Sequence, residues 1–150
     1  MRLLLDTHIW LWSAREPERL SRRVANEIKN AESELWLSPI SIWELITLSR
    51  KGRVANFPDI ETLISQTLQA LPLNEAPVTN EVAREVGRLR LPHRDPADHF
   101  LVATAKVFDL TLVTADEQLM KAAGIAVLPN RRNGSPKPGP LISGSTARSR

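Results

Sequence analysis

RDPADHFLVATAKVFDLTLVTAD, residues 94–116, joins a predicted helix to a predicted strand and carries acidic residues near both ends. Asp95 fits a helix N-cap, a proline follows at the first helical position, and Asp98 takes the third, where a carboxylate favours the positive end of the helix dipole. Apolar spacing predicts a helix over Ala97–Phe108 and a buried strand over Thr111–Val113. Capping alone accounts for both acids at the helix start, so an acidic site requires carboxylates from elsewhere in the chain.

The rest of the chain alternates predicted strands with predicted helices. Other short apolar runs predict buried strands at Leu3–Leu5, Leu35–Leu37, Leu71–Leu73 and Ile125–Leu128. Helical spacing occurs over Ser21–Ala31, Ile42–Arg50, Ile60–Ala70, Glu81–Leu89 and Glu117–Ala122. We interpret MRLLLDTHIWLWSA, residues 1–14, as a strand and not a signal peptide, because Asp6 and His8 interrupt its apolar run. The alternation favours an α/β fold with a parallel sheet covered by helices on both faces.

Composition predicts one globular domain followed by a tail. The 150 residues are 42% hydrophobic and 25% charged, and cysteine is absent, which excludes disulfides and thiolate ligands and favours the cytoplasm. Residues 131–150, RRNGSPKPGPLISGSTARSR, carry five basic residues and no acid, whereas the other 130 carry 15 basic and 17 acidic residues. We therefore expect a domain over 1–130 and a disordered basic tail over 131–150. No apolar run has the roughly 20 residues that a membrane-spanning helix needs.

Four acids fall where a parallel sheet places its ligands, beyond the carboxyl ends of strands. Asp6 ends the first predicted strand, Asp116 follows a later one with Thr114 two residues before it, and Glu44 lies early in the helix after the second strand, for which Ser41 is a possible cap. With Asp98 they could share one edge of the sheet. Taken singly, each acid also fits a turn or a helix cap. Taken together, buried carboxylates need a counter-charge, which a divalent cation would supply.

These motifs resemble those of PIN-domain ribonucleases, and within that family the VapC toxins of bacterial type II toxin–antitoxin pairs. The resemblance spans about residues 1–130 and rests on LLLDTHIWLW, SPISIWELITLSRKGR, LPHRDPADHFLVATA and LTLVTADEQL, in that order. It implies a three-layer α/β/α sandwich with a central, mainly parallel sheet of four or five strands. By this resemblance the acidic quartet that carries catalysis and binds metal is Asp6, Glu44, Asp98 and Asp116. Supporting roles fall to Thr114, Asp95 and Thr7.

The sequence departs from the family pattern beside two of these acids. His99 stands where relatives often have arginine, and Ala97 where they often have a bulky aromatic residue. Neither change removes a carboxylate. His8, His93 and His99 form no spaced metal motif, so the expected ligands are the acids alone.

The expected chemistry is hydrolysis of RNA phosphodiester bonds by an endoribonuclease that depends on Mg²⁺ or Mn²⁺. Oxygen ligands suit these ions, which activate water and stabilise charge on phosphate. RNA contacts would come from a basic rim whose candidates are Arg15, Arg19, Arg22, Arg23, Arg50, Lys51, Arg53, Arg88, Arg90 and Arg94. The resemblance also implies a homodimer and a cognate antitoxin whose C-terminal segment crosses the active-site groove.

Two other classes of function compete with this hypothesis. A catalytically silent RNA- or protein-binding PIN-like module has little reason to gather carboxylates where phosphate must approach. A metal-dependent phosphatase is disfavoured because DTHIW lacks the second aspartate of the haloacid-dehalogenase pattern. Core packing is expected to explain most of the four tryptophans, and Trp10 and Trp12 also suit an interface.

Overall fold

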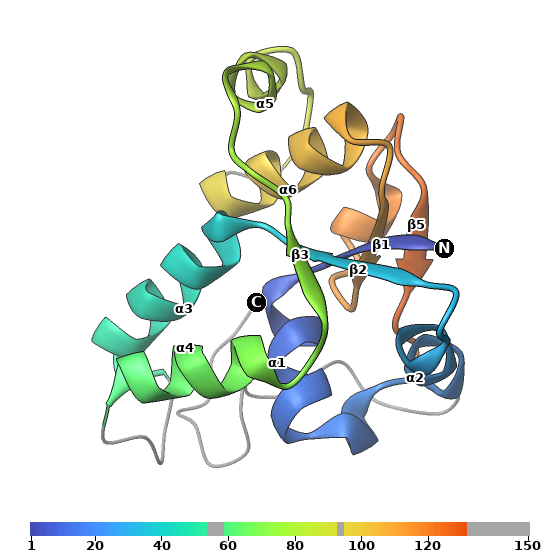
Figure 1. The fold of residues 1–150 in the computed structure, drawn as a ribbon. Helices are drawn as coiled ribbons and strands as arrows, with labels where there is room; N and C mark the ends of the chain where they lie inside the picture. The colour runs from blue at the N-terminus through green and yellow to red at the C-terminus, as the bar shows by residue number, and fades with distance from the viewer. Residues whose placement is uncertain (54–58, 93–94, 132–150) are drawn as a thin grey trace.

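The computed structural model describes residues 1–53, 59–92 and 95–131, and its centre is a five-stranded parallel sheet. The strands stand side by side in the order β3-β2-β1-β4-β5 and every neighbouring pair is parallel (Figure 1). Their bounds are Arg2–Leu5 for β1, Glu34–Leu37 for β2, Leu73–Glu75 for β3, Thr111–Thr114 for β4 and Val127–Pro129 for β5. The predicted parallel α/β sheet is confirmed, with five strands.

Helices cover both faces of this sheet and create two cores. Their bounds are Thr7–Arg15 for α1, Arg22–Lys29 for α2, Pro39–Arg50 for α3, Ile60–Gln69 for α4, Asn80–Val86 for α5 and Pro96–Val107 for α6. Alternate side chains of β1 point to opposite faces: Leu3 and Leu5 pack with α1 to α4, and Leu4 packs with α6. The result is the predicted three-layer sandwich.

The interpretation of residues 1–14 as a strand is wrong beyond Leu5, because α1 begins at Thr7. Asp6 caps this helix, and its Oδ1 accepts a hydrogen bond from the Thr7 backbone N–H at 2.7 Å. Every residue from Thr7 to Trp12 is buried, since α1 packs against the sheet as well as α3 and α4. A helix buried on all sides has no polar stripe, so its sequence period does not distinguish it from a buried strand.

Other boundaries also differ from the prediction. The helix after β2 begins three residues earlier than expected: Ser38, and not Ser41, caps α3, its Oγ accepting from the Ile40 N–H at 3.1 Å. The segment Glu117–Ala122 forms only a single 3-10 turn, at Leu119–Lys121. Strand β3 lies two residues later than the apolar run Leu71–Leu73, because pairing with β2 and not hydrophobicity fixes this edge strand.

The chain end lies mostly outside the described residues. Residues 132–150 fall there, so the disordered tail and the domain boundary near 130 stay predictions. Among the described residues, none of the helices has the length and apolar character needed to cross a membrane.

The strand order creates a switch point at the centre of the sheet. From β1 the chain builds outward through β2 to β3, and it then returns to the other side of β1 to form β4 and β5. The carboxyl ends of β1 and β4 are therefore adjacent while the connections leaving them diverge, which is where ligands bind in open α/β sheets.

Candidate acidic active site

Asp6 lies at the switch point with both carboxylate oxygens fixed. Its side chain is buried, and Oδ1 accepts the Thr7 backbone N–H as the cap of α1. Its Oδ2 accepts a hydrogen bond of 2.7 Å from the Thr114 hydroxyl at the end of β4. Two donors from two elements hold the carboxylate in one orientation.

Thr114 links Asp6 to the next acid along the edge. Its Oγ1 accepts the Asp116 backbone N–H at 3.0 Å while it donates to Asp6. The Asp116 carboxylate in turn accepts the Gln118 N–H at 2.8 Å, which closes the turn after β4. A single hydroxyl thus connects the loops that follow β1 and β4.

Asp95 and Asp98 open α6 as the spacing in the sequence predicts. Asp95 caps the helix by accepting the Ala97 N–H at 3.0 Å, and Asp98 lies in the first turn with a side chain that is 5% exposed. Capping therefore explains Asp95. It does not explain the burial of Asp98, because a carboxylate that serves only the helix dipole can remain in water.

Glu44 comes from the other side of the site, on α3. Its side chain is buried, whereas most glutamates on helix surfaces are solvated. Helices α3 and α6 are in contact, and the negative charge of Glu44 acts on Asp98, so the two acids lie near each other.

The charges of all these acids act on Asp98. Burial first, and then the negative charges of Asp6, Asp95, Asp116 and Glu44, raise the pKa of its carboxyl from 3.8 to about 8. Carboxylates from four separate segments are therefore gathered at one edge of the sheet. The convergence that the sequence could only suggest is present in the fold.

The donor set of this cluster suits a hard divalent cation. The acids offer carboxylate oxygens, the ligands that Mg²⁺ and Mn²⁺ prefer, and a cation would offset both the burial of these acids and the repulsion between them. Within residues 1–53, 59–92 and 95–131, no three acidic or histidine side chains already converge tightly enough to hold one ion. Binding would therefore have to draw the carboxylates closer together.

The other candidate residues differ in their surroundings. Thr7 contributes its backbone N–H to Asp6, but its buried hydroxyl has no hydrogen-bond partner in the described part of the chain. His8 is buried and packs edge-on against Trp12, with ring centroids 5.6 Å apart. His99 is half-buried beside Asp98, and His93 lies outside the described residues.

The fold and its acidic edge match a known family. The family described as PIN domain matches residues 3–125. The chain belongs to the PIN domain family. Ribonuclease VapC22 from Mycobacterium tuberculosis is 32% identical over 120 residues, which cover 78% of this chain and 88% of that relative, and places this PIN domain with the VapC proteins.

Solved structures share the fold at lower identity. VapBC2 from Rickettsia felis, bound to a DNA fragment from its promoter, has a TM-score of 0.67 and 17% identity, covering 86% of this PIN domain and 98% of that chain. VapBC-5 from Mycobacterium tuberculosis, a member of the VapBC family of toxin-antitoxin systems, has a TM-score of 0.52 and 22% identity, with coverages of 85% and 98%. Both support the three-layer architecture.

Proposed function

We propose that this PIN domain is an endoribonuclease that depends on Mg²⁺ or Mn²⁺ and acts as the toxin of a toxin–antitoxin pair. The observation that carries the proposal is the gathering of buried carboxylates at the switch point, where burial first and then the charges of the neighbouring acids raise the pKa of Asp98 to about 8. Structural proteins avoid burying like charges together, whereas metal-dependent nucleases need them. The ribonuclease name of the VapC22 relative supports RNA as the substrate.

Each acid has a distinct role in this proposal. Asp6, Asp98 and Asp116 hold the ion, and Glu44 is a further ligand or orients the attacking water. When bound, the ion supplies charge for the phosphate and activates water. Thr114 keeps the Asp6 carboxylate oriented through its 2.7 Å hydrogen bond, and Asp95 holds the start of α6 in place.

The proposed partners follow from the relatives. VapBC-5 from Mycobacterium tuberculosis is a member of the VapBC family of toxin-antitoxin systems, so we expect a cognate antitoxin that covers the acidic site, and a homodimer of the toxin. An RNA substrate and the absence of cysteine favour the cytoplasm as the site of action.

Cleavage of total cellular RNA by the purified, antitoxin-free chain tests the proposal. We expect fragments in the presence of Mg²⁺ or Mn²⁺, and none with a chelator or with Asp6→Asn or Asp98→Asn. Asp109→Asn is the matched control, because Asp109 is exposed beyond the far end of α6 and its φ of 52° is one that asparagine tolerates. This control should cleave like the wild type.

One observation favours a second function, a silent RNA- or protein-binding module. The described residues hold no tight group of three ligand side chains, as a protein that never binds metal would also show. Intact RNA after incubation with folded, antitoxin-free protein in Mn²⁺ would support this alternative and refute the nuclease.

A further inference from the structure

Trp43 differs from the other tryptophans in its exposure to solvent. Trp10 and Trp12 are fully buried, and Trp36 is partly covered by the Arg2 guanidinium, 5.6 Å from its ring centroid. Trp43 is 50% exposed, so the expectation that core packing explains most tryptophans does not extend to it. A single exposed aromatic side chain is common on protein surfaces, so the groups around Trp43 decide whether it belongs to a binding surface.

Trp43 begins a stripe along the outer side of α3 that continues with Thr47 and Arg50. These residues follow one another at helical spacing, and seven residues of helix place Arg50 about 10 Å from Trp43 along the axis. The Thr47 hydroxyl donates to the Trp43 carbonyl at 3.0 Å, which leaves the indole and the guanidinium as the two binding groups. We call these three residues the Trp43 face.

The end of the Trp43 face at the C-terminus of α3 is positively charged. Arg50 and Lys51 are exposed, and in the described part of the chain neither forms a hydrogen bond or an ion pair through its side chain. The sequence contains no acid between Glu44 and Asp59. Arg19 and Arg88, two other candidates for a basic rim, are instead paired with Glu16 and Glu85. The cations of α3 therefore remain available for phosphate.

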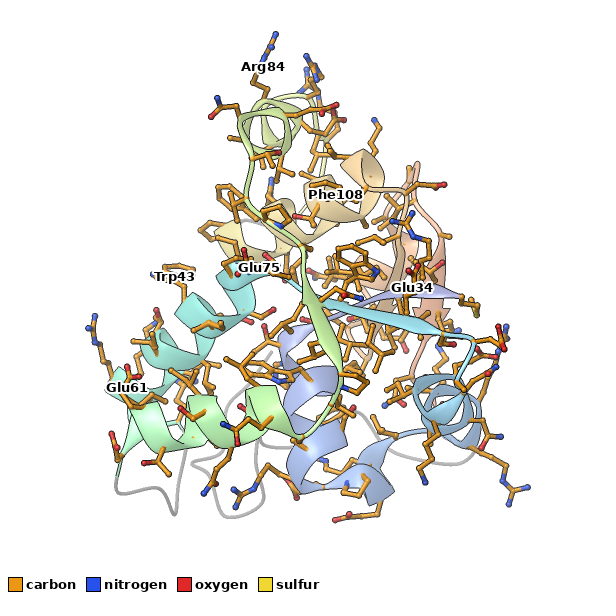
Figure 2. The ribbon with its side chains drawn as sticks, in the orientation of Figure 1. Glu34, Trp43, Glu61, Glu75, Arg84 and Phe108 are labelled. Carbon is orange, nitrogen blue, oxygen red and sulfur yellow. The ribbon has the colours of Figure 1, made fainter. Side chains whose placement is uncertain are left out.

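The Trp43 face also lies next to the acidic site. Glu44 follows Trp43 directly but is buried, so the helix presents an acid inward and the indole outward at neighbouring positions. Figure 2 shows Trp43 projecting away from α4, on the side of α3 toward α6, whose first turn carries Asp98. A strand that reaches the acids between α3 and α6 passes this indole.

We propose that the Trp43 face binds unpaired RNA beside the scissile phosphate, with a base stacked on Trp43 and a phosphate held by Arg50. The proposal rests on the proposed ribonuclease function. The acidic cluster repels phosphate, so the attraction for RNA must come from groups around it. Aromatic stacking is suited to this because every base has a π-face and unpaired RNA exposes it.

RNA binding and cleavage by the full chain test the proposal. Binding of a short fluorescein-labelled RNA without internal pairing is measured in chelator, and the KM for its cleavage is measured in Mn²⁺. Trp43→Ala should weaken binding and raise KM by about 5- to 100-fold, since stacking contributes about 1–3 kcal/mol per base. Trp43→Phe should retain most of the affinity, because it keeps an aromatic face.

Arg50→Gln tests the phosphate contact separately. It should reduce the slope of log affinity against log salt by about 0.7, the value for one phosphate contact on a single strand. Lys29→Gln removes one positive charge from an exposed position on α2, and Leu68→Ala truncates an exposed apolar side chain on α4. Both controls should bind RNA like the wild type.

The outcomes separate this inference from the function on which it rests. If the wild type cleaves RNA and Trp43→Ala has an unchanged KM and affinity, the inference is overturned while the nuclease stands. Should Trp43→Ala instead convert a dimer to a monomer in sedimentation, with RNA affinity unchanged, the Trp43 face is an interface with a second copy. A wild type that neither cleaves nor binds RNA removes both proposals.

Discussion

Asp98 shows how one residue satisfies a local rule and a tertiary one at the same time. Its place in the first turn of α6 is favourable for any carboxylate, because the helix dipole is positive there. The fold then buries it among other acids, which raises its pKa to about 8. The helix dipole alone explains why an acid stands at this position. Only the burial of Asp98 among other acids indicates a catalytic or metal-binding role.

The raised pKa predicts a pH-dependent stability of the metal-free protein. The folded state binds more protons than the unfolded state between pH 3.8 and about 8, so the free energy of unfolding falls as the pH rises through this range. Asp98→Asn removes the ionisable group. Its stability relative to wild type should be greater at about pH 8.5 than at about pH 4.5, by about 1–4 kcal/mol. Urea unfolding in chelator at both pH values measures this difference, and a pH-independent difference would contradict it.

Removing the Thr114 hydroxyl should leave the Asp6 carboxylate without its fixed orientation while the charge of the site stays the same. Thr114→Val keeps the shape but removes the donor to Asp6 and the acceptor for the Asp116 N–H, at a cost of about 1–3 kcal/mol of stability. Mn²⁺ affinity, measured by calorimetry, should fall with it. Thr114→Ser keeps the hydroxyl and should restore affinity; equal affinity in the valine and serine variants would remove Thr114 from the supporting role.

At the scale of elements, α1 and α3 use tryptophan in opposite ways. In α1, Trp10 is fully buried and its indole N–H donates to the Thr67 carbonyl of α4 at 3.2 Å, which ties two helices of one layer together. In α3, Trp43 faces solvent. The difference follows from position: α1 packs between the sheet and two helices, whereas α3 has a free outer side.

This contrast predicts unequal costs for the same substitution. Trp10→Ala should lower the free energy of unfolding by about 3–5 kcal/mol, because it leaves a cavity and an unpaired carbonyl. Trp43→Ala should change it by less than about 0.5 kcal/mol. Denaturant unfolding of the two variants under identical conditions makes the comparison, and a comparable loss in both would mean that Trp43 has a packing role.

At the scale of the whole molecule, the strand order decides where the acids meet. Because β1 and β4 are neighbours, segments far apart in sequence end at the same edge, and α3 and α6 add their acids from the two faces of the sheet. This arrangement places like charges close together, and their repulsion lowers the stability of the fold. We expect such a cluster to gain stability when a cation binds.

Metal binding should therefore stabilise the wild type specifically. Saturating Mn²⁺ or Mg²⁺ should raise Tm by several degrees, since ligand at about 100 times its Kd adds about 2.7 kcal/mol. Asp6→Asn should lose most of this shift, and Asp109→Asn should keep it. Differential scanning calorimetry with and without chelator measures the effect; an equal shift in all three proteins would mean that the ion binds elsewhere.

The sequence by itself determined the elements whose signals are local. Short apolar runs predicted the strands β1, β2 and β4 to within one residue, and Asp95 with the proline after it predicted the start of α6, because capping and hydrophobic runs act over a few residues. Motif order predicted the family. The roles of the individual acids stay proposals.

Only the tertiary structure decided which side chains are buried and which of them meet. Helix α1 is buried on every side, so its sequence has no period that distinguishes it from a buried strand, and hydrophobicity alone does not report which of the four tryptophans is exposed. The pKa of Asp98 likewise depends on charges from other elements. Burial and electrostatic repulsion act through space between segments remote in sequence, so they exist only once the strand order has brought those segments together.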